Sequence, residues 1–167
     1  MPPMTHPIAR LLALSLAFCT VPAAAASPAA PPVAAPNAAG VIRLRSANDF
    51  DQTVARLKSD VAAKNIRFFD QIDQTALGAG ADLKIRRSTL VLFGNPPLGV
   101  QFLQSNPYAG LDWPVRMLVI EEADGSIWVA WTDFNFIADR YAIGDRAAQF
   151  KMASEVAQSI ATAATSG

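Results

Sequence analysis

The sequence predicts an α+β domain in which helices pack on a largely antiparallel sheet. Short segments rich in β-branched and aromatic residues alternate with segments that have helical periodicity. Two of these strand-like segments, residues 114–121 and 126–132, flank Asp124-Gly125, a dipeptide typical of hairpin turns. The region that carries these patterns, residues 41–167, has the length of one domain with one core.

The start of the chain has the layout of a cleaved signal peptide, residues 1–26. Arg10 supplies a positive charge, residues 11–18 are apolar, and residues 24–26 are the small alanines at which a signal peptidase cuts. The apolar stretch is much shorter than the about 20 residues that span a bilayer. We therefore expect a periplasmic or secreted protein without an integral membrane segment after cleavage.

Cleavage would remove the only cysteine, Cys19, and the only histidine, His6. The mature chain would then lack disulfides, catalytic triads, cysteine nucleophiles and histidine-based zinc sites. Lipid attachment at Cys19 is an alternative, although Phe18 stands where a lipoprotein signal has a small residue, and an uncleaved anchor is another. We expect no cofactor and no bound metal.

The charge balance argues against nucleic acid as a partner. Loss of Arg10 leaves thirteen basic and fourteen acidic residues, and the densest basic segment is residues 84–87. Three cations around one apolar residue are typical of the solvated side of a strand.

The first elements follow an uncharged tether. Residues 27–40 contain four prolines and no periodic pattern, which predicts an extended segment. Residues 41–45 alternate apolar and basic side chains, as an edge of a sheet does. Asp49 and Gln52 then form a capping box in front of an amphipathic helix, which Asn65 ends.

The middle of the chain predicts two further strands. Residues 66–72 are aromatic and β-branched, and residues 83–93 form a longer strand with a fully apolar end. Between them, residues 74–81 hold two glycines among alanines and predict an irregular helix or a loop. The prolines of residues 94–97 end the long strand before a short helix at residues 98–104.

After the hairpin, Asp133 is placed to cap a short helix over residues 134–141. A final helix over residues 145–162 carries a broad apolar stripe. We expect the hairpin strands to be core structure rather than part of an active site.

Several of these landmarks occur in an order that points to a known family. They are residues 69–73, residues 90–96 with their Phe-Gly-Asn-Pro ending, the Leu-Asp-Trp-Pro of residues 111–114, and the hairpin residues 121–129. In this respect the chain resembles the DUF302 family, a domain of unknown function, over residues 50–141. The resemblance implies a small α+β fold and a homodimer, and it implies no established activity.

One position departs from that family. Gln74 stands where the family usually has a histidine after the Ile-Asp pair. An amide can orient a polar ligand, but it does not titrate. Any step that depends on that histidine in relatives would be lost here, and we therefore lean away from catalysis.

The ends of the predicted strands carry the polar side chains that we consider for a ligand site. The candidate ligand-binding residues are Asp73, Gln74, Gly94, Asn95, Trp131 and Asp133. The competing interpretations are structural: Gly94 for a turn, Asn95 for a bond to neighbouring backbone, and Asp133 for a helix cap.

The tryptophans bear on oligomeric state. Trp128 and Trp131 lie three apart on one strand, so they face opposite sides of the sheet. One is expected in the core, and the other at a dimer contact or a ligand cleft. Trp113 could also stack on a ligand.

Three functions remain open from the sequence. The first is a non-catalytic, homodimeric binding module for a small ligand or an envelope protein. The second is a hydrolase that works with carboxylates alone, built on Asp73 and Asp133. The third is a structural envelope protein without a ligand.

Overall fold

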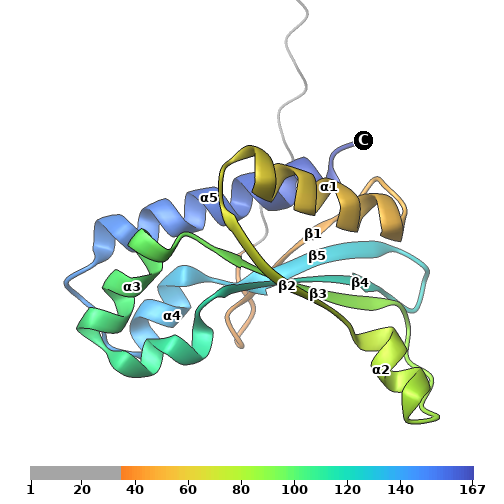
Figure 1. Cartoon of the computed structure of the whole chain (residues 1–167), viewed down its shortest axis with the longest axis horizontal. Coiled ribbons are helices and arrows are strands. Elements are labelled where there is room, and N and C mark those ends of the chain that lie inside the picture. Colours follow the sequence, from red (N-terminus) through yellow and green to blue (C-terminus); the bar gives the residue numbers. More distant parts are fainter. Residues whose placement is uncertain (1–34) are drawn as a thin grey trace, which may run out of the picture.

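Five strands form one antiparallel sheet in the order β1-β5-β4-β3-β2 in the computed structural model, which describes residues 35–167. The two longest helices, α1 (Phe50–Ala63) and α5 (Ala147–Thr165), lie side by side over one face of the sheet (Figure 1). The predicted α+β fold is confirmed. The strands are β1 (Val41–Arg45), β2 (Arg67–Asp73), β3 (Ser88–Gly94), β4 (Val115–Glu121) and β5 (Ile127–Thr132).

Shorter helices stand at the two ends of the sheet. At one end α2 (Gln74–Gly80) follows β2, and at the other end lie α3 (Pro96–Ser105), the 3-10 helix η1 (Pro107–Asp112) and α4 (Phe134–Arg140). The predicted signal peptide and residues 27–34 of the predicted tether lie outside the described residues.

Aspartate caps fix where three of the helices begin, namely Asp49 for α1, Asp73 for α2 and Asp133 for α4. Asp49 accepts a hydrogen bond from the backbone amide of Gln52 at 2.8 Å, which is the first of the two bonds of the predicted capping box. Asp133 accepts a hydrogen bond from the backbone amide of Asn135 at 3.3 Å and caps α4, which confirms the expected cap. Asn65 has a positive φ of 53°, the conformation that ends a helix and that asparagine tolerates.

The long strand predicted over residues 83–93 is wrong in its first half, because β3 begins only at Ser88. Its neighbour β2 stops pairing at Asp73, which lies opposite Thr89, and the chain then turns into α2. Residues before Ser88 therefore have no strand beside them on that edge. Leu83 and Ile85 in this segment are exposed rather than buried.

The hairpin of β4 and β5 forms the centre of the core, as expected. Gly125 takes a positive φ of 79° in the turn between the strands. Val119 lies opposite Val129, and Met117 lies opposite Trp131. Among these, Val119, Val129 and Met117 are fully buried beneath α1 and α5.

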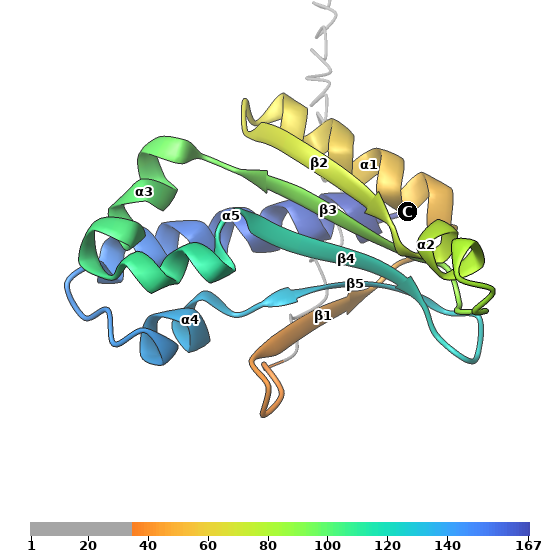
Figure 2. The same cartoon turned by 60° about the horizontal axis from the view of Figure 1, so that its bottom comes forward.

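The opposite face of the sheet is only partly covered. Figure 2 turns this face forward, and no helix crosses the middle of the strands. We call it the open face; its apolar residues are half-buried, and they are Ile72, Leu90, Leu92, Leu118, Ile120, Trp128 and Ala130.

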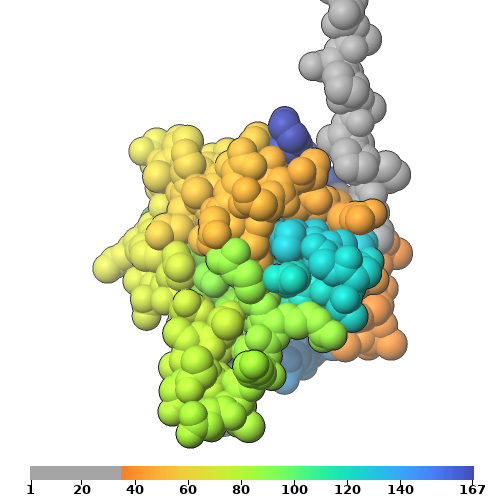
Figure 3. All heavy atoms as spheres, turned by 90° about the vertical axis from the view of Figure 1, so that its right-hand side faces the viewer, coloured from red at the N-terminus to blue at the C-terminus, as the bar shows by residue number. Residues whose placement is uncertain are grey.

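At one end of the open face α2 and the loop after it project from the molecule (Figure 3). This projection exposes three large apolar side chains, Leu77, Leu83 and Ile85. At the other end of the sheet, Tyr108 and Leu111 of η1 are exposed in the same way.

The domain begins slightly before the predicted boundary at Val41. The Asn37 side chain accepts hydrogen bonds from the amides of Ala39 and Val41, at 2.9 and 3.0 Å. Gly40 is buried with a φ of 72°, and a Cβ there would lie 2.3 Å from the Phe136 ring. The last residue of the predicted tether, Gly40, is therefore packed against α4, whereas residues 35–39 are exposed.

Candidate functional site

The register of β2 and β3 separates the residues that the sequence suggested for one pocket. Asp73 lies opposite Thr89 at one end of the pair, whereas Gly94 lies opposite Arg67 at the other end. The predicted single pocket around Asp73, Gln74, Asn95 and Asp133 is therefore not formed. Asp73 and Gln74 belong to the end of the sheet that carries α2, and Gly94, Asn95 and Asp133 belong to the end that carries α3 and α4.

At the α2 end, both candidate side chains hold local structure. The Asp73 carboxylate caps α2 by accepting a hydrogen bond from the Ala76 amide at 3.0 Å. The Gln74 carbonyl oxygen accepts one from the Ser88 hydroxyl at 2.6 Å, which ties α2 to the start of β3.

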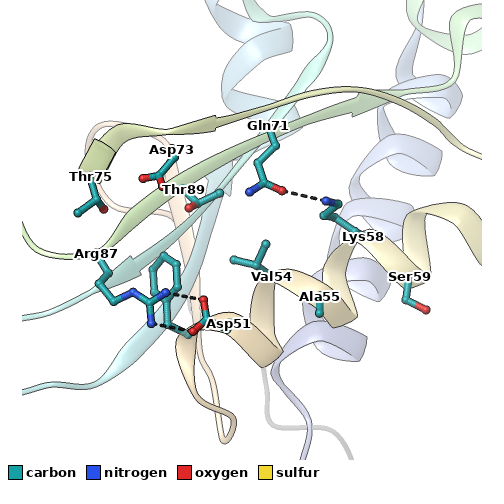
Figure 4. Close-up of a pocket in the computed structure, with 11 residues that line it drawn as sticks. Asp51, Val54, Ala55, Lys58, Ser59, Gln71, Asp73, Thr75, Arg87 and Thr89 are labelled. Atoms are coloured by element: carbon teal, nitrogen blue, oxygen red, sulfur yellow. Dashed lines mark hydrogen bonds and ion pairs between the residues drawn. The ribbon is translucent and has the colours of Figure 1, made fainter. Parts of the chain in front are cut away.

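An open groove of about 670 Å³ runs between α1 and this end of the sheet (Figure 4). We call it the polar groove. Its lining residues are Phe50, Asp51, Val54, Ala55, Lys58, Ser59, Gln71, Asp73, Thr75, Arg87 and Thr89.

The polar groove holds one ion pair, Asp51–Arg87, and its lysine is bonded to a neutral side chain. Arg87 donates hydrogen bonds to both oxygens of Asp51 and stacks over the Phe50 ring at 4.2 Å. These hydrogen bonds hold the pKa of the Asp51 carboxyl below its ordinary value. Lys58 donates to the Gln71 side chain at 3.0 Å (Figure 4). The Asp51–Arg87 pair is therefore internally satisfied, whereas Lys58 keeps two of its three N–H bonds free for a ligand.

At the other end of the sheet, Trp131 and Asp133 are part of the folded core. Trp131 is buried on the helix-covered face, and Trp128 is half-buried on the open face, so the predicted division of the two tryptophans is confirmed. Asp133 is also buried and caps α4. Neither Trp131 nor Asp133 lines the polar groove or the cavity described next.

The remaining two candidates, Gly94 and Asn95, lie at the mouth of an apolar cavity of about 330 Å³. The cavity is bounded by α3, α5 and the adjacent ends of β3 and β4. We call it the apolar cavity; it is lined by Lys64, Ile66, Phe93, Gly94, Asn95, Leu98, Gly99, Phe102, Trp113, Val115, Phe134, Met152, Ala153, Val156 and Ala157.

Glycines make room for the Trp113 indole at this cavity. A Cβ on Gly99 would lie 1.7 Å from Trp113 Nε1, and a Cβ on Gly94 would lie 3.4 Å from the same atom. Phe69 packs edge-on against the other side of the indole, with ring centroids 5.6 Å apart. The indole therefore has a fixed place in the cavity wall only because residue 99 has no side chain.

Sequence reasoning missed Lys64 as a residue of the cavity, and it named Trp113 only as a side chain that could stack on a ligand. Lys64 lies just after α1, where a lysine is ordinary, so nothing in the sequence marked it. Trp113 could have been found through the Gly94–Gly99 spacing, because two glycines five apart next to prolines indicate close approach of another group.

A buried carboxylate between η1 and α4 was missed as well. The Asp112 side chain is 4% exposed and accepts hydrogen bonds from Arg116, from Arg140 at 3.3 Å and from the Tyr141 hydroxyl at 2.6 Å. The hydrogen bond to Asp112 and burial raise the pKa of the Tyr141 hydroxyl. This cluster is a satisfied structural network that joins η1, β4 and α4.

Residues 35–167 hold neither a grouped set of metal ligands nor a membrane-spanning helix. Within that range no three histidine, cysteine, aspartate or glutamate side chains are grouped so as to hold a metal ion. None of the helices in the same range is long and apolar enough to cross a membrane.

Comparison with known proteins finds longer relatives. The chain is 28% identical over 114 residues to a fluoride-specific ion channel, FluC 1, of Brucella suis biovar 1 (strain 1330), and the match covers 68% of this chain and 45% of that protein. FluC 1 of Brucella abortus biovar 1 (strain 9-941) matches equally well over 42% of its length. The chain thus spans less than half the length of these relatives.

A solved structure and a family model match the folded domain itself. The crystal structure of an uncharacterized conserved DUF302 protein from Bacillus stearothermophilus superposes with a TM-score of 0.69 at 12% identity, covering 76% of this chain and 99% of that one. At this identity the likeness shows the fold alone. The model for the domain of unknown function DUF302 matches residues 42–166, and the chain therefore belongs to the DUF302 family.

Proposed function

We propose that this protein is an exported binding module that holds a small apolar ligand in the apolar cavity and catalyses no reaction. The cavity itself carries the proposal. Ligand sites are concave and mostly apolar with few polar groups, and cavities of about 300–1,000 Å³ are typical. At about 330 Å³ the apolar cavity is at the small end of that range.

The arrangement of carboxylates favours binding over hydrolysis. The two residues proposed for a carboxylate-only hydrolase, Asp73 and Asp133, lie at opposite ends of the sheet, and each caps a helix. Glycoside hydrolysis needs its two carboxyl groups within about 10 Å of each other across one bond. No aspartate or glutamate lines the apolar cavity.

Calorimetric titration with 1-octanol tests whether the apolar cavity accepts an uncharged apolar molecule. We expect saturable binding to the wild type, and we expect Ala153→Leu to weaken it by an order of magnitude or more, because the new side chain fills part of the cavity. Ala147→Leu, at an exposed position on the same helix, is the matched control and should bind like the wild type.

Two results would contradict the proposal. One is equal binding by Ala153→Leu and Ala147→Leu, which would place the alcohol elsewhere. The other is the absence of saturable binding to the wild type, which would favour the structural envelope protein without a ligand.

The partner that we propose is a second copy of the chain, docked on the open face. The apolar residues of this face are half-buried, and exposed apolar side chains rim it at α2 and η1. A homodimer would cover these side chains through a twofold-symmetric contact.

The charges at the two edges of the open face fit such a contact. On this face the β1 edge carries Arg43 and Arg45, and the β2 edge carries Asp70. A twofold axis parallel to the strands would set β1 of one copy across from β2 of the other. Arg45 and Asp70 have no ion-pair partner among residues 35–167, so the two edges carry opposite charges that are not used within one copy.

Export is proposed from the sequence alone, since residues 1–34 lie outside the described residues. Intact-mass measurement of the periplasmic protein should give a chain that starts near Ser27 and does not react with thiol reagents. A full-length mass, or the added mass of a diacylglyceryl group, would contradict this expectation.

The longer relatives suggest fluoride as a second candidate ligand. They are named as fluoride-specific ion channels, and their match to this chain covers 42–45% of their length. A saturable heat on titration with sodium fluoride, absent with sodium chloride, would support fluoride. Equal, unsaturable heats with both salts would remove it.

A further inference from the structure

The polar groups around the apolar cavity are almost all hydrogen-bond donors. Only three of its lining side chains carry nitrogen or oxygen: Lys64, Asn95 and Trp113. An ammonium and an indole N–H donate only, and an amide both donates and accepts. No lining side chain is a carboxylate.

Each of these three groups has donor capacity left. Lys64 donates to Asp60 at 2.6 Å, which uses one of its three N–H bonds. Asn95 precedes α3 but makes no side-chain cap hydrogen bond. Trp113 Nε1 has no hydrogen-bond partner within residues 35–167, whereas Trp128 Nε1 donates to the Ser126 hydroxyl at 2.8 Å.

Free hydrogen-bond donors beside an apolar wall fit a ligand whose head group accepts hydrogen bonds and whose body is apolar. Trp113 is half-buried, and its indole N–H is a donor that a ligand in the cavity could use. The ammonium of Lys64 is ion-paired with Asp60 at 2.6 Å, so its charge is balanced locally, but two of its three N–H bonds remain free to donate. A carboxylate satisfies such donors better than a hydroxyl, because charge-assisted hydrogen bonds are stronger than neutral ones.

We infer that the ligand of the apolar cavity is a small monocarboxylic acid with a hydrocarbon body, its carboxylate held at the mouth by Lys64, Asn95 and Trp113. The inference rests on the proposed function. The cavity of about 330 Å³ has the volume of about eleven liquid water molecules, at about 30 Å³ each. A body of about ten non-hydrogen atoms, such as octanoate, fits that space.

The test is calorimetric titration of the purified protein with octanoate, 1-octanol and octylamine at pH 7. These share one tail and differ in the head, which is anionic, neutral or cationic. We expect octanoate to bind tightest and octylamine weakest, with the two ions on the order of tenfold apart, because a carboxylate accepts hydrogen bonds from the free donors of Lys64, Asn95 and Trp113, whereas an ammonium head accepts none.

Variants separate the head contact from the tail contact. Lys64→Met should weaken octanoate several-fold and leave 1-octanol unchanged, and Lys64→Arg should retain the preference for octanoate. Lys151→Met, on the exposed side of α5, is the matched control and should behave as the wild type. Trp113→Phe keeps a ring in the wall and removes the N–H donor, so it should weaken octanoate as well.

The outcomes distinguish the two proposals. If 1-octanol binds but octylamine binds as tightly as octanoate, or Lys64→Met leaves octanoate unchanged, the carboxylate is wrong and the binding module stands. If none of the three compounds binds, the proposed function fails together with the inference.

Discussion

The Asp112 carboxylate accepts hydrogen bonds from side chains that are distant in the sequence. For this reason the sequence alone did not identify Asp112 as a buried carboxylate. Arg116 lies four residues after Asp112, near the start of β4, but Arg140 is the last residue of α4 and Tyr141 follows it directly. No local pattern links these positions. By contrast, Asp49 and Asp133 could be assigned as helix caps from sequence, because a cap and its amide are two or three residues apart.

The Tyr141 hydroxyl gives a prediction in alkaline solution. Its pKa is raised by the hydrogen bond to Asp112 and by burial, so the folded state holds this proton more tightly than the unfolded state. The stability gained from the hydroxyl is complete below the ordinary tyrosine pKa of about 10 and is lost as the pH rises through the raised value. We expect the urea midpoint of Tyr141→Phe to lie below that of the wild type at pH 8, and the gap to narrow as the pH rises above about 10.

The only other tyrosine, Tyr108, provides the control, because its side chain is exposed and has no comparable partner among the described residues. Tyr108→Phe should match the wild type throughout this pH range. A Tyr141→Phe midpoint that follows the wild type in parallel up to pH 11 would show that the hydroxyl does not couple to folding.

At the scale of elements, sequence patterns identified all five strands of residues 35–167. The errors in element boundaries arose where a boundary depends on contacts with another part of the chain. The apolar pattern of residues 83–93 reads as one strand, but only residues that face a partner become β3, which starts at Ser88. Residues 37–40 look like linker, yet Asn37 folds them back and Gly40 packs on Phe136. In both cases the deciding contact is made by a segment that the local pattern does not describe.

The β4–β5 hairpin gives the prediction for this scale. Val119 is 0% exposed, so Val119→Ala should lower the free energy of unfolding by about 1–3 kcal/mol through lost contacts and a cavity. Val100→Ala, on the exposed side of α3, removes the same atoms and should change it by less than about 0.5 kcal/mol. Equal unfolding free energies for the two variants, measured by urea titration, would refute the placement of the hairpin in the core.

For the whole molecule, the order of the strands decides where a site can form. The sequence indicated which strand ends are polar, and antiparallel pairing of β2 with β3 then sent Asp73 and Asn95 to opposite ends. Strand order is set by contacts across the whole chain, and the pattern within one strand does not contain it. For this reason Gly94 and Asn95 line the apolar cavity, while Asp73 caps α2 and Gln74 bonds α2 to the start of β3.

The proposed homodimer is tested by sedimentation equilibrium over a dilution series. We expect a mass near two chains at micromolar concentration. Leu118→Asp places a charge in the middle of the open face and should give single chains, whereas Val100→Asp, on exposed α3 surface, should remain dimeric. A mass near one chain at all micromolar concentrations would remove the dimer.

The claim that the apolar cavity is the ligand site is tested most directly by a two-dimensional ¹H–¹⁵N NMR titration with 1-octanol. We expect saturable shifts of the backbone amides of Gly94, Gly99 and Val156, which line the apolar cavity, and unchanged amides of Gln71 and Thr89 in the polar groove. Saturable shifts confined to the polar groove or to the open face, or shifts that never saturate, would contradict the account.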